Sequence, residues 1–238
     1  MSKTVFITGG SGGIGSAAVQ AFAEAGYNVA FIYNKNEAAA KELCSDIPGS
    51  FMVQCDVTDG ESVNSAVEAA LRHFGKIDVL INNAGIAEQI LFTDITEEGW
   101  DTMLATNLKS CFLTAKAVIP QMISRKSGSI INVSSMWGIT GASCEVHYSA
   151  AKSGVIGLSK ALAKELGPSG IRVNAVAPGV VDTPMNSHLD ENAMSMLKEE
   201  IPLGKIGRPE EVASALLFLA ENEYITGQVI TVDGGMVI

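Results

Sequence analysis

The stretch that decides the fold of this chain is TGGSGGIG at residues 8–15. An apolar, β-branched run at residues 4–8 leads into it, and a helical pattern opens directly after it. Glycines allow a backbone to approach a pyrophosphate without side-chain clashes, and a helix N-terminus supplies free N–H groups and the positive end of the helix dipole. The glycines have the spacing TGxxxGxG and not the commoner GxGxxG. The turn therefore predicts a dinucleotide-binding strand–turn–helix unit, the alternative being a glycine-rich turn that binds nothing.

The rest of the chain repeats this alternation of strand and helix. Apolar, β-branched segments predict strands at residues 4–8, 28–33, 50–54, 77–81, 128–134, 171–177 and 228–232. Amphipathic segments predict helices at residues 14–25, 37–46, 60–74, 97–119, 146–166 and 209–220. We therefore expect one α/β domain over residues 1–238, a doubly wound parallel sheet of about seven strands with helices on both faces. Residues 179–203 break the alternation and are a candidate substrate loop, or else a plain surface excursion.

The composition argues against several classes of protein. The 238 residues carry a formal net charge of −10, and 47% of them are hydrophobic. An acidic chain is repelled by phosphate backbones and anionic membranes, so we expect neither nucleic acid nor membrane as a partner. The four cysteines have no CxxC spacing and no accompanying histidine cluster, so neither a disulfide framework nor a bound metal is expected. The apolar run at residues 213–220 is too short to cross a bilayer, and the expected location is the cytoplasm.

Three residues in the second half of the chain form a candidate catalytic set. Tyr148 and Lys152 are four residues apart on a predicted helix and therefore share a face. A free tyrosine has a pKa of about 10, and the neighbouring ammonium is expected to lower the pKa of Tyr148 and make it usable as a general acid. Ser135 lies thirteen residues before Tyr148, at the end of a predicted strand where a parallel sheet binds ligands. Its hydroxyl can bind a carbonyl oxygen, with the adjacent Ser134 as a competitor.

Four segments in this order resemble the short-chain dehydrogenase/reductase family. They are TGxxxGxG at residues 8–15, Asn82-Asn83-Ala84-Gly85, the Ser135…Tyr148-x-x-x-Lys152 set and Pro178-Gly179. The resemblance covers essentially the whole chain and implies a Rossmann fold, a nicotinamide cofactor and a homotetramer. It also implies a fourth catalytic residue, Asn107, which in the family interrupts a helix and anchors a water that relays protons to the lysine.

The turn and the resemblance together predict a set of cofactor-binding residues, spread over the loops that follow the predicted strands. These residues are Gly9, Ser11, Gly13, Ile14, Gly15, Asn34, Lys35, Asp56, Val57, Asn83, Ala84, Gly85, Tyr148, Lys152, Pro178, Gly179, Val181 and Thr183. The resemblance implies that Asp56 and Val57 border the adenine, the alternative for Asp56 being a turn cap.

The end of the second predicted strand favours NADP(H) over NAD. NAD enzymes carry a carboxylate there for the ribose 2′-hydroxyl, whereas this chain has none before Glu37. Lys35 and the amide of Asn34 can instead hold a 2′-phosphate, and Ser11 in the glycine turn can add a hydroxyl. Lys35 as an ordinary solvated lysine is the alternative.

The substrate is less well defined by the sequence. The chain resembles bacterial 3-oxoacyl-[acyl-carrier-protein] reductases, which reduce a ketone on a thioester-linked acyl chain with NADPH. It departs from them at Glu145, where those enzymes typically have Gln, and at Ser169, where a basic residue often meets the carrier protein; Arg125 and Lys126 remain as a docking pair.

Two further readings stay open. Residues 134–146 resemble reductases of 5-aminopentanone-modified elongation factor P, whose cationic substrate Glu145 would favour. From another class, a catalytically silent NADP-binding regulator or a scaffold is compatible with the fold but does not need the catalytic set.

Overall fold

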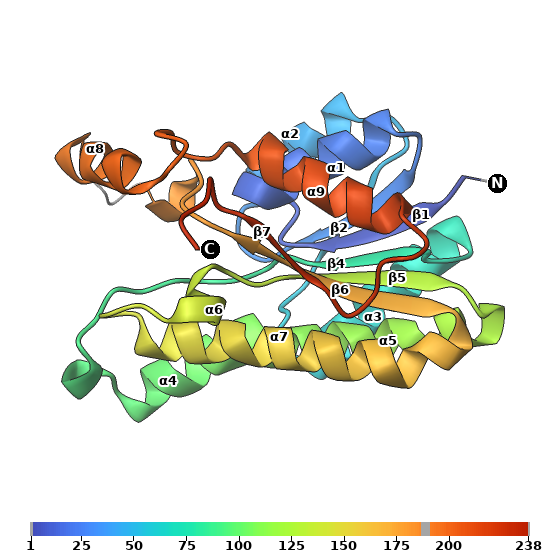
Figure 1. Cartoon of the computed structure of the whole chain (residues 1–238). Helices are drawn as coiled ribbons and strands as arrows, with labels where there is room; N and C mark the ends of the chain where they lie inside the picture. Colours follow the sequence, from blue (N-terminus) through green and yellow to red (C-terminus); the bar gives the residue numbers. More distant parts are fainter. Residues whose placement is uncertain (1, 187–190, 238) are drawn as a thin grey trace.

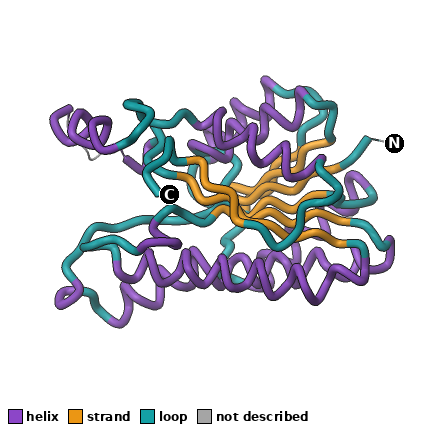
Figure 2. The backbone as a smooth tube through the Cα atoms, in the orientation of Figure 1, coloured by secondary structure: helices purple, strands orange, loops and turns teal. Residues whose placement is uncertain are grey.

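A computed structural model, which describes residues 2–186 and 191–237, contains one seven-stranded sheet in which all strands are parallel (Figures 1 and 2). Its strand order is β3-β2-β1-β4-β5-β6-β7. The strands are β1 (Thr4–Thr8), β2 (Asn28–Tyr33), β3 (Phe51–Gln54), β4 (Val79–Asn82), β5 (Gly128–Val133), β6 (Ile171–Pro178) and β7 (Val229–Val232). The order reverses direction between β1 and β4, which creates the crevice where open α/β sheets bind ligands.

Helices cover both faces of this sheet, as Figure 1 shows. The α-helices in the described part of the chain are α1 (Gly13–Glu24), α2 (Glu37–Asp46), α3 (Gly60–Phe74), α4 (Glu97–Leu104), α5 (Ser110–Arg125), α6 (Trp137–Thr140), α7 (Val146–Leu166), α8 (Glu191–Glu200) and α9 (Pro209–Glu221), of which α4 and α8 project beyond the sheet. One apolar core lies between the sheet and α1, α2 and α9, and a second lies between the sheet and α3, α5 and α7. The predicted doubly wound α/β fold is therefore confirmed.

Local signals explain why several helices begin where the sequence predicted. The side chain of Asn36 accepts the N–H of Ala39 and caps α2, and the side chain of Asp59 accepts the N–H of Glu61 and caps α3. These caps satisfy N–H groups that have no partner within the helix. The helices predicted at 37–46, 60–74 and 146–166 match α2, α3 and α7.

Two predicted segments are corrected by the structure. The single helix expected at 97–119 is divided by a turn of π-helix at Ala105–Lys109, and its second part, α5, runs on to Arg125. The irregular region 179–203 contains the short 3₁₀ helix Pro184–Asn186 and the helix α8, while residues 187–190 lie outside the described residues. Helix α8 is rich in strong helix formers such as Ala, Met, Leu, Glu and Lys, a signal that the polar character of the region obscured.

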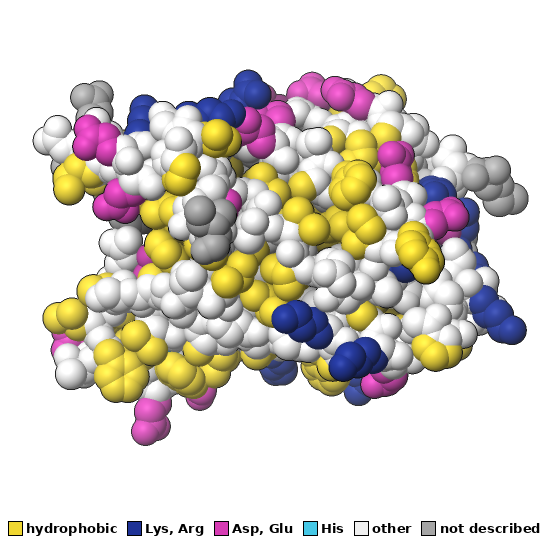
Figure 3. Space-filling view, in the orientation of Figure 1, with side chains coloured by type: hydrophobic (Ala, Val, Ile, Leu, Met, Phe, Trp, Pro, Cys, Tyr) yellow, Lys and Arg dark blue, Asp and Glu magenta, His cyan; other side chains and the backbone are white. Residues whose placement is uncertain are grey.

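The surface of the domain carries several exposed apolar side chains. In Figure 3 they gather over α9 and the segment that follows it, where Phe218 is 52% exposed and Tyr224 is 100% exposed. No helix within the described part of the chain is both long enough and apolar enough to cross a membrane.

Candidate active site

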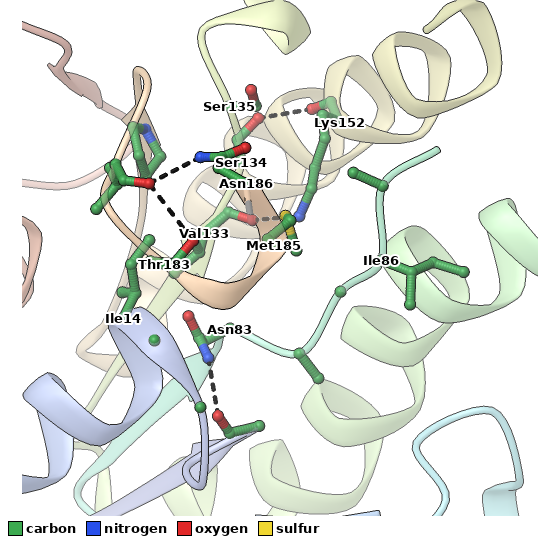
Figure 4. A pocket seen from close by; sticks show the side chains of 18 of the residues that line it. Ile14, Asn83, Ile86, Val133, Ser134, Ser135, Lys152, Thr183, Met185 and Asn186 are labelled. Atoms are coloured by element: carbon green, nitrogen blue, oxygen red, sulfur yellow. Dashed lines mark hydrogen bonds between the residues drawn. The ribbon is translucent and has the colours of Figure 1, made fainter. Parts of the chain in front are cut away.

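A cavity of about 520 Å³ opens at the carboxyl ends of β1, β4, β5 and β6 (Figure 4). It brings together segments that are far apart in the sequence. Of the predicted site residues, its walls contain Gly9, Gly13, Ile14, Asn83, Ala84, Gly85, Ser135, Tyr148, Lys152, Pro178, Gly179, Val181 and Thr183. The cavity therefore joins the glycine turn to the catalytic set.

The glycine turn forms one wall of the cavity and leads into α1. Gly13 has a φ of 41°, a left-handed conformation that side chains other than glycine rarely adopt, and a Cβ there would lie 2.9 Å from Thr183 Cγ2. A Cβ on Gly15 would collide with the carbonyl oxygen of Gly9. The helix starts without a side-chain cap at Gly12, so its first N–H groups receive no bond from that residue's side chain. This combination of close backbone and an uncapped helix start fits a pyrophosphate.

Thr8 and Asn83 hold the glycine turn against the loop that follows β4. Thr8 Oγ1 accepts the N–H groups of Asn83 and Ala84, each at 2.9 Å. Asn83 Nδ2 in turn donates to the carbonyl oxygens of Thr8 at 3.1 Å and Gly9 at 3.3 Å, and Figure 4 shows its amide directed at this strand end. Thr8 was missed as a site residue in the sequence because its role is to position a neighbouring loop.

Lys152 lies at the inner end of the cavity and is fully buried. Its Nζ donates to the carbonyl oxygen of Val133 at 2.9 Å and lies 5.7 Å from the centre of the Tyr148 ring. Burial lowers the pKa of Lys152 to about 8 because the charged form is poorly solvated. An ammonium with a pKa this close to neutrality can take up or release a proton during a reaction.

Tyr148 and Ser135 are both buried in the wall of this cavity, where hydrogen bonding from Ser135 affects the pKa of Tyr148. Ser135 Oγ accepts the N–H of Trp137 at 3.1 Å, which leaves its own proton to be donated. Burial raises the pKa of Tyr148 to about 12, the bond from Ser135 acts in the opposite direction, and the charge of Glu145 adds to the rise. The expectation that Lys152 lowers the pKa of Tyr148 is therefore wrong for this structure, because loss of solvation is the larger effect. Tyr148 is a neutral phenol at neutral pH, which is the form that donates a proton.

Asn107 lies in the π-helical turn between α4 and α5 and has no exposed surface. Its Oδ1 accepts the N–H of Ile86 at 3.2 Å, and its Nδ2 donates to the carbonyl oxygens of Ile86 at 3.0 Å and Met103 at 3.1 Å. A Cβ on Gly85 would meet both Asn107 Oδ1 at 2.6 Å and Lys152 Nζ at 3.4 Å. The fold therefore places Asn107 beside Lys152, as a proton relay requires, while the water itself stays a prediction.

The remaining predicted cofactor residues lie outside this cavity. Gly15 is buried and Ser11 is half-buried in the glycine turn, whereas Asn34 and Lys35 are exposed just beyond β2. Asp56 Oδ1 accepts the N–H of Thr58 at 2.9 Å and its hydroxyl at 2.7 Å. These bonds lower the pKa of Asp56, with a smaller contribution from the charge of Lys35. Asp56 thus caps a turn, and its contact with adenine stays a prediction, as does that of the neighbouring Val57.

A second cavity of about 710 Å³ shares Ser135, Tyr148 and Gly179 with the first and extends toward α8. Glu145 lines it, as the sequence led us to expect, and accepts a weak hydrogen bond from Gln89 Nε2 at 3.5 Å. Two further carboxylates, Glu88 and Glu200, line the same cavity. Sequence reasoning missed these two residues because they come from the loop after β4 and from α8, and no motif marks either one.

Glu88 has a partner that the sequence did not identify. Its Oε2 lies 3.4 Å from Nε2 of His147, a histidine with no exposed surface on the first turn of α7. On the neighbouring loop, the carbonyl oxygen of Cys144 accepts the N–H of Ile90 at 2.8 Å. These contacts fasten the loop after β4 to the segment before Tyr148, so that Glu88 and Glu145 share one wall.

Arg125 and Lys126, the expected carrier-docking pair, lie at the other edge of the sheet. They end α5 just before β5 begins at Gly128, whereas both cavities open where the strands end. Arg125 also forms an ion pair with Asp78 at 2.6 Å and donates to the carbonyl oxygen of Ile77. The docking of a carrier protein at this pair stays a prediction, and the pair lies away from both cavities.

Comparisons with known proteins agree with the fold and the site. A family model described as enoyl-(acyl carrier protein) reductase matches residues 9–237. A 3-oxoacyl-[acyl-carrier-protein] reductase of Chlamydia muridarum is 44% identical, over 99% of this chain and 98% of that protein. Proteins of the same name from Thermotoga maritima and Staphylococcus epidermidis are 44% and 41% identical, each over 99% of this chain and over 98% and 99% of their own lengths.

The parallel sheet, the phosphate-binding turn and the buried Ser135, Tyr148 and Lys152 define a nucleotide-dependent oxidoreductase. Within that class, the chain belongs to the short-chain dehydrogenase/reductase family. It is accordingly an NADP-dependent oxidoreductase that acts on a CH–OH or carbonyl group.

Proposed function

We propose that this chain reduces the ketone of a 3-oxoacyl thioester to the 3-hydroxyacyl product with NADPH. The observation that carries this proposal is the burial of Ser135 and Tyr148 together at the junction of the two cavities, with Lys152 buried behind them. The names of the relatives, 3-oxoacyl-[acyl-carrier-protein] reductases at 40–44% identity, support the same substrate.

The residues of the first cavity fit a dinucleotide. The glycine turn is packed so closely that a Cβ at Gly15 would collide with the backbone. The uncapped start of α1 has N–H groups that can bind a diphosphate. We propose that Asn83, Ala84 and Gly85 line the ribose side and that Lys35 and Asn34 hold the 2′-phosphate at the end of β2. When bound, NADPH supplies the hydride that reduces the ketone carbon.

Residues of the chain then bind and protonate the oxygen of the ketone. Ser135 and Tyr148 donate hydrogen bonds to that oxygen and stabilise the negative charge that develops on it. The C=O π electrons become a lone pair on the oxygen, which takes the proton of Tyr148. Lys152 stabilises the resulting phenolate and, with a pKa of about 8, can return a proton to it.

The paired hydroxyls support reduction of C=O over reduction of C=C. Both residues line the junction of the two cavities, so an oxygen held between them can be bound and protonated in place. Reduction of an enoyl thioester, which the description of the family model names, would instead end with a proton on carbon. We therefore assign the ketone reaction to this site.

A second candidate substrate is a ketone that carries a cation, such as the 5-aminopentanone group on elongation factor P. The observation in its favour is the charge of the second cavity, to which Glu88, Glu145 and Glu200 contribute carboxylates. No lysine or arginine is present among the described residues that line it. Carboxylates in a partly closed cavity attract a cation and disfavour an apolar acyl chain.

The loss of NADPH absorbance with each ketone tests both candidates. We expect turnover of a 3-oxoacyl thioester with NADPH and little with NADH. The variant Glu145→Gln should raise kcat/KM for the thioester relative to an amine-bearing ketone by about fivefold, about 1 kcal/mol of charge preference. Glu98→Gln, a change on the surface of α4, is the control. Equal ratios in both variants would remove Glu145 from substrate selection, and binding of NADPH without turnover of any ketone would favour a silent regulator.

We also propose that residues 179–203 act as the substrate loop of the single domain. Met185, Met196 and Leu197 of this segment line the second cavity next to Tyr148. Met196 is 65% exposed, so an apolar side chain is held at the mouth of the cavity. A ketone substrate would bury this surface on binding.

Finally, we propose a homotetramer that acts in the cytoplasm. Two separate apolar surfaces support it, one over α9 with Phe218 and Tyr224 and one between α5 and α7 with Phe112 and Leu158 (Figure 3 shows the first). Two such surfaces on one chain generate a closed assembly of four. Light scattering of Phe112→Lys and Phe218→Lys, each expected to give dimers, tests the assembly.

The proposed location in the cytoplasm is supported by the use of NADPH and by the four free cysteines, which fit a reducing compartment.

A further inference from the structure

Four buried polar side chains form a continuous hydrogen-bonded chain on the α5–α7 face of the sheet. Thr114 Oγ1 on α5 donates to Asn82 Oδ1 on β4 at 2.6 Å. Asn82 Nδ2 donates to Asn132 Oδ1 on β5 at 2.8 Å, and Asn132 Nδ2 donates to Ser159 Oγ on α7 at 2.8 Å. We call these four residues the brace; none of them is more than 3% exposed.

The surroundings of the brace are apolar, so its polar character needs a reason. The same face of the sheet buries Ile130, Leu80, Ala115 and Val118 in one hydrophobic core. Polar groups in such a core cost free energy unless they are fully hydrogen-bonded, and apolar side chains of similar size would fill the space as well. Hydrogen bonds, unlike apolar contacts, have a direction and a narrow range of lengths. The brace therefore fixes geometry more than it adds stability.

The brace connects two helices through two neighbouring strands. Asn82 and Asn132 are direct partners in the parallel pairing of β4 and β5. One end of the brace is Thr114 on α5 and the other is Ser159 on α7. The spacing between the helices at this level therefore depends on three consecutive hydrogen bonds.

Each end of the brace lies two helical turns from a predicted catalytic residue. Thr114 follows Asn107 by seven residues, and Ser159 follows Lys152 by seven. Seven residues make about two turns of α-helix, so Lys152 and Ser159 lie close to one face of α7, and Asn107 lies in the π-helical turn that leads directly into α5. Asn107 Oδ1 and Lys152 Nζ both approach Gly85, as their distances of 2.6 and 3.4 Å from a Cβ built there show. A shift of α5 against α7 would therefore change the distance between these two groups.

The strand residues of the brace also adjoin the site directly. Asn132 precedes Val133, whose carbonyl oxygen accepts Lys152 Nζ at 2.9 Å. Asn82 precedes Asn83, which holds the glycine turn. We propose that the brace residues are positioning residues, which set the placement of Asn107 and Lys152 relative to each other and to the ends of β4 and β5.

The first test compares kcat in matched variants, and it rests on the proposed reductase activity. Ser159→Ala and Thr114→Val should each lower kcat about tenfold, because small misplacements of reacting groups are costly, and should leave the Kd for NADPH within about twofold. They should also shift the high-pH limb of the kcat profile, since the contact of Lys152 changes. Ser129→Ala removes a buried hydroxyl from β5 that has no hydrogen-bond partner in the described part of the chain, and it should behave as wild type. Thr114→Ser, which keeps the hydroxyl, should restore kcat.

The second test needs no substrate. The N–H of Ile86 donates to Asn107 Oδ1, so amide hydrogen exchange at Ile86 reports on the position of Asn107. Faster exchange at Ile86 in Thr114→Val, but not in Ser129→Ala, supports the positioning role of the brace. Absence of turnover with every ketone would contradict the proposed function but would leave this result standing. Unchanged exchange and unchanged kcat in Thr114→Val and Ser159→Ala would overturn the inference. A loss of kcat that Ser129→Ala shares would also overturn the inference. The same holds for a loss of kcat that accompanies a lowered Tm while the pH profile stays unchanged.

Discussion

The two cavities that meet at Tyr148 are built in different ways. The first is formed by backbone and short side chains in loops that each follow directly on a strand, such as the glycine turn and the Asn83–Gly85 loop. The second takes its carboxylates from three separate segments, the loop after β4, the segment before α7, and α8. Both cavities join segments that are far apart in the sequence, but those of the first include short motifs at strand ends, whereas the carboxylates of the second stand singly. A cofactor common to many enzymes can be bound by short local motifs, whereas a particular substrate needs contacts that vary independently.

The largest effect is expected where the cavities meet. Tyr148→Phe removes the proton donor and should lower kcat about a thousandfold, within the range attributed to general acid catalysis. The Kd for NADPH should change by less than about twofold, since the aromatic ring stays in place. Tyr224→Phe, at a fully exposed position, is the control. Steady-state turnover together with a fluorescence titration of NADPH measures both quantities, and a kcat equal to that of wild type would show that Tyr148 is not the proton donor.

The next largest effect is expected at the glycine turn, the part of the first cavity that is built from backbone atoms. Gly15→Ala places a Cβ against the carbonyl oxygen of Gly9, so the turn must shift. We expect the Kd for NADPH to rise about tenfold and the free energy of unfolding to fall by about 1–3 kcal/mol. Gly167→Ala is the matched control because a Cβ there meets nothing within 4 Å. Equal Kd values for the two variants would show that the glycine turn does not carry the cofactor.

A smaller change tests the preference between cofactors. Lys35→Ala should raise the Kd for NADPH about tenfold, the worth of one charge-assisted hydrogen bond, and leave the Kd for NADH unchanged. Lys41→Ala removes an exposed lysine that pairs with Glu37 on the same side of the molecule and should alter neither value. If both cofactors weaken equally in Lys35→Ala, Lys35 does not contact the 2′-phosphate.

The smallest effect concerns pH. Burial lowers the pKa of Lys152 to about 8, so the folded protein loses this charge as the pH rises through about 8, while Tyr148, with a pKa of about 12, stays protonated. We expect kcat for ketone reduction to fall by a few-fold across this range. Arginine does not deprotonate, so the residual activity of Lys152→Arg should show no such fall. A pH profile of wild type that is flat from about 7 to about 9, one unit below and above the pKa of about 8, would contradict the role of Lys152 as a titrating group.

Particular residues show how much of the fold and of the site could be predicted from the sequence. The seven strands, the glycine turn and the juxtaposition of Ser135, Tyr148 and Lys152 followed from local patterns and were confirmed as placements. The lowered pKa expected for Tyr148 was wrong, because burial depends on everything packed around the ring. Glu88, Glu200 and His147 could not be found, since each gains its neighbours from a different element.

By itself, the sequence determined the parallel α/β fold, the glycine turn after β1 and the set of Ser135, Tyr148 and Lys152 that meets in the first cavity. These follow from short-range rules of hydrophobic period, glycine geometry and the spacing of side chains along one helix. Only the tertiary structure decided the charge of the substrate cavity, the position of Arg125 away from it, and the hydrogen bonds of Thr114, Asn82, Asn132 and Ser159 that hold α5 and α7. The physical reason is that desolvation, ion pairing and hydrogen-bond geometry depend on distances in space, which distances along the chain do not fix.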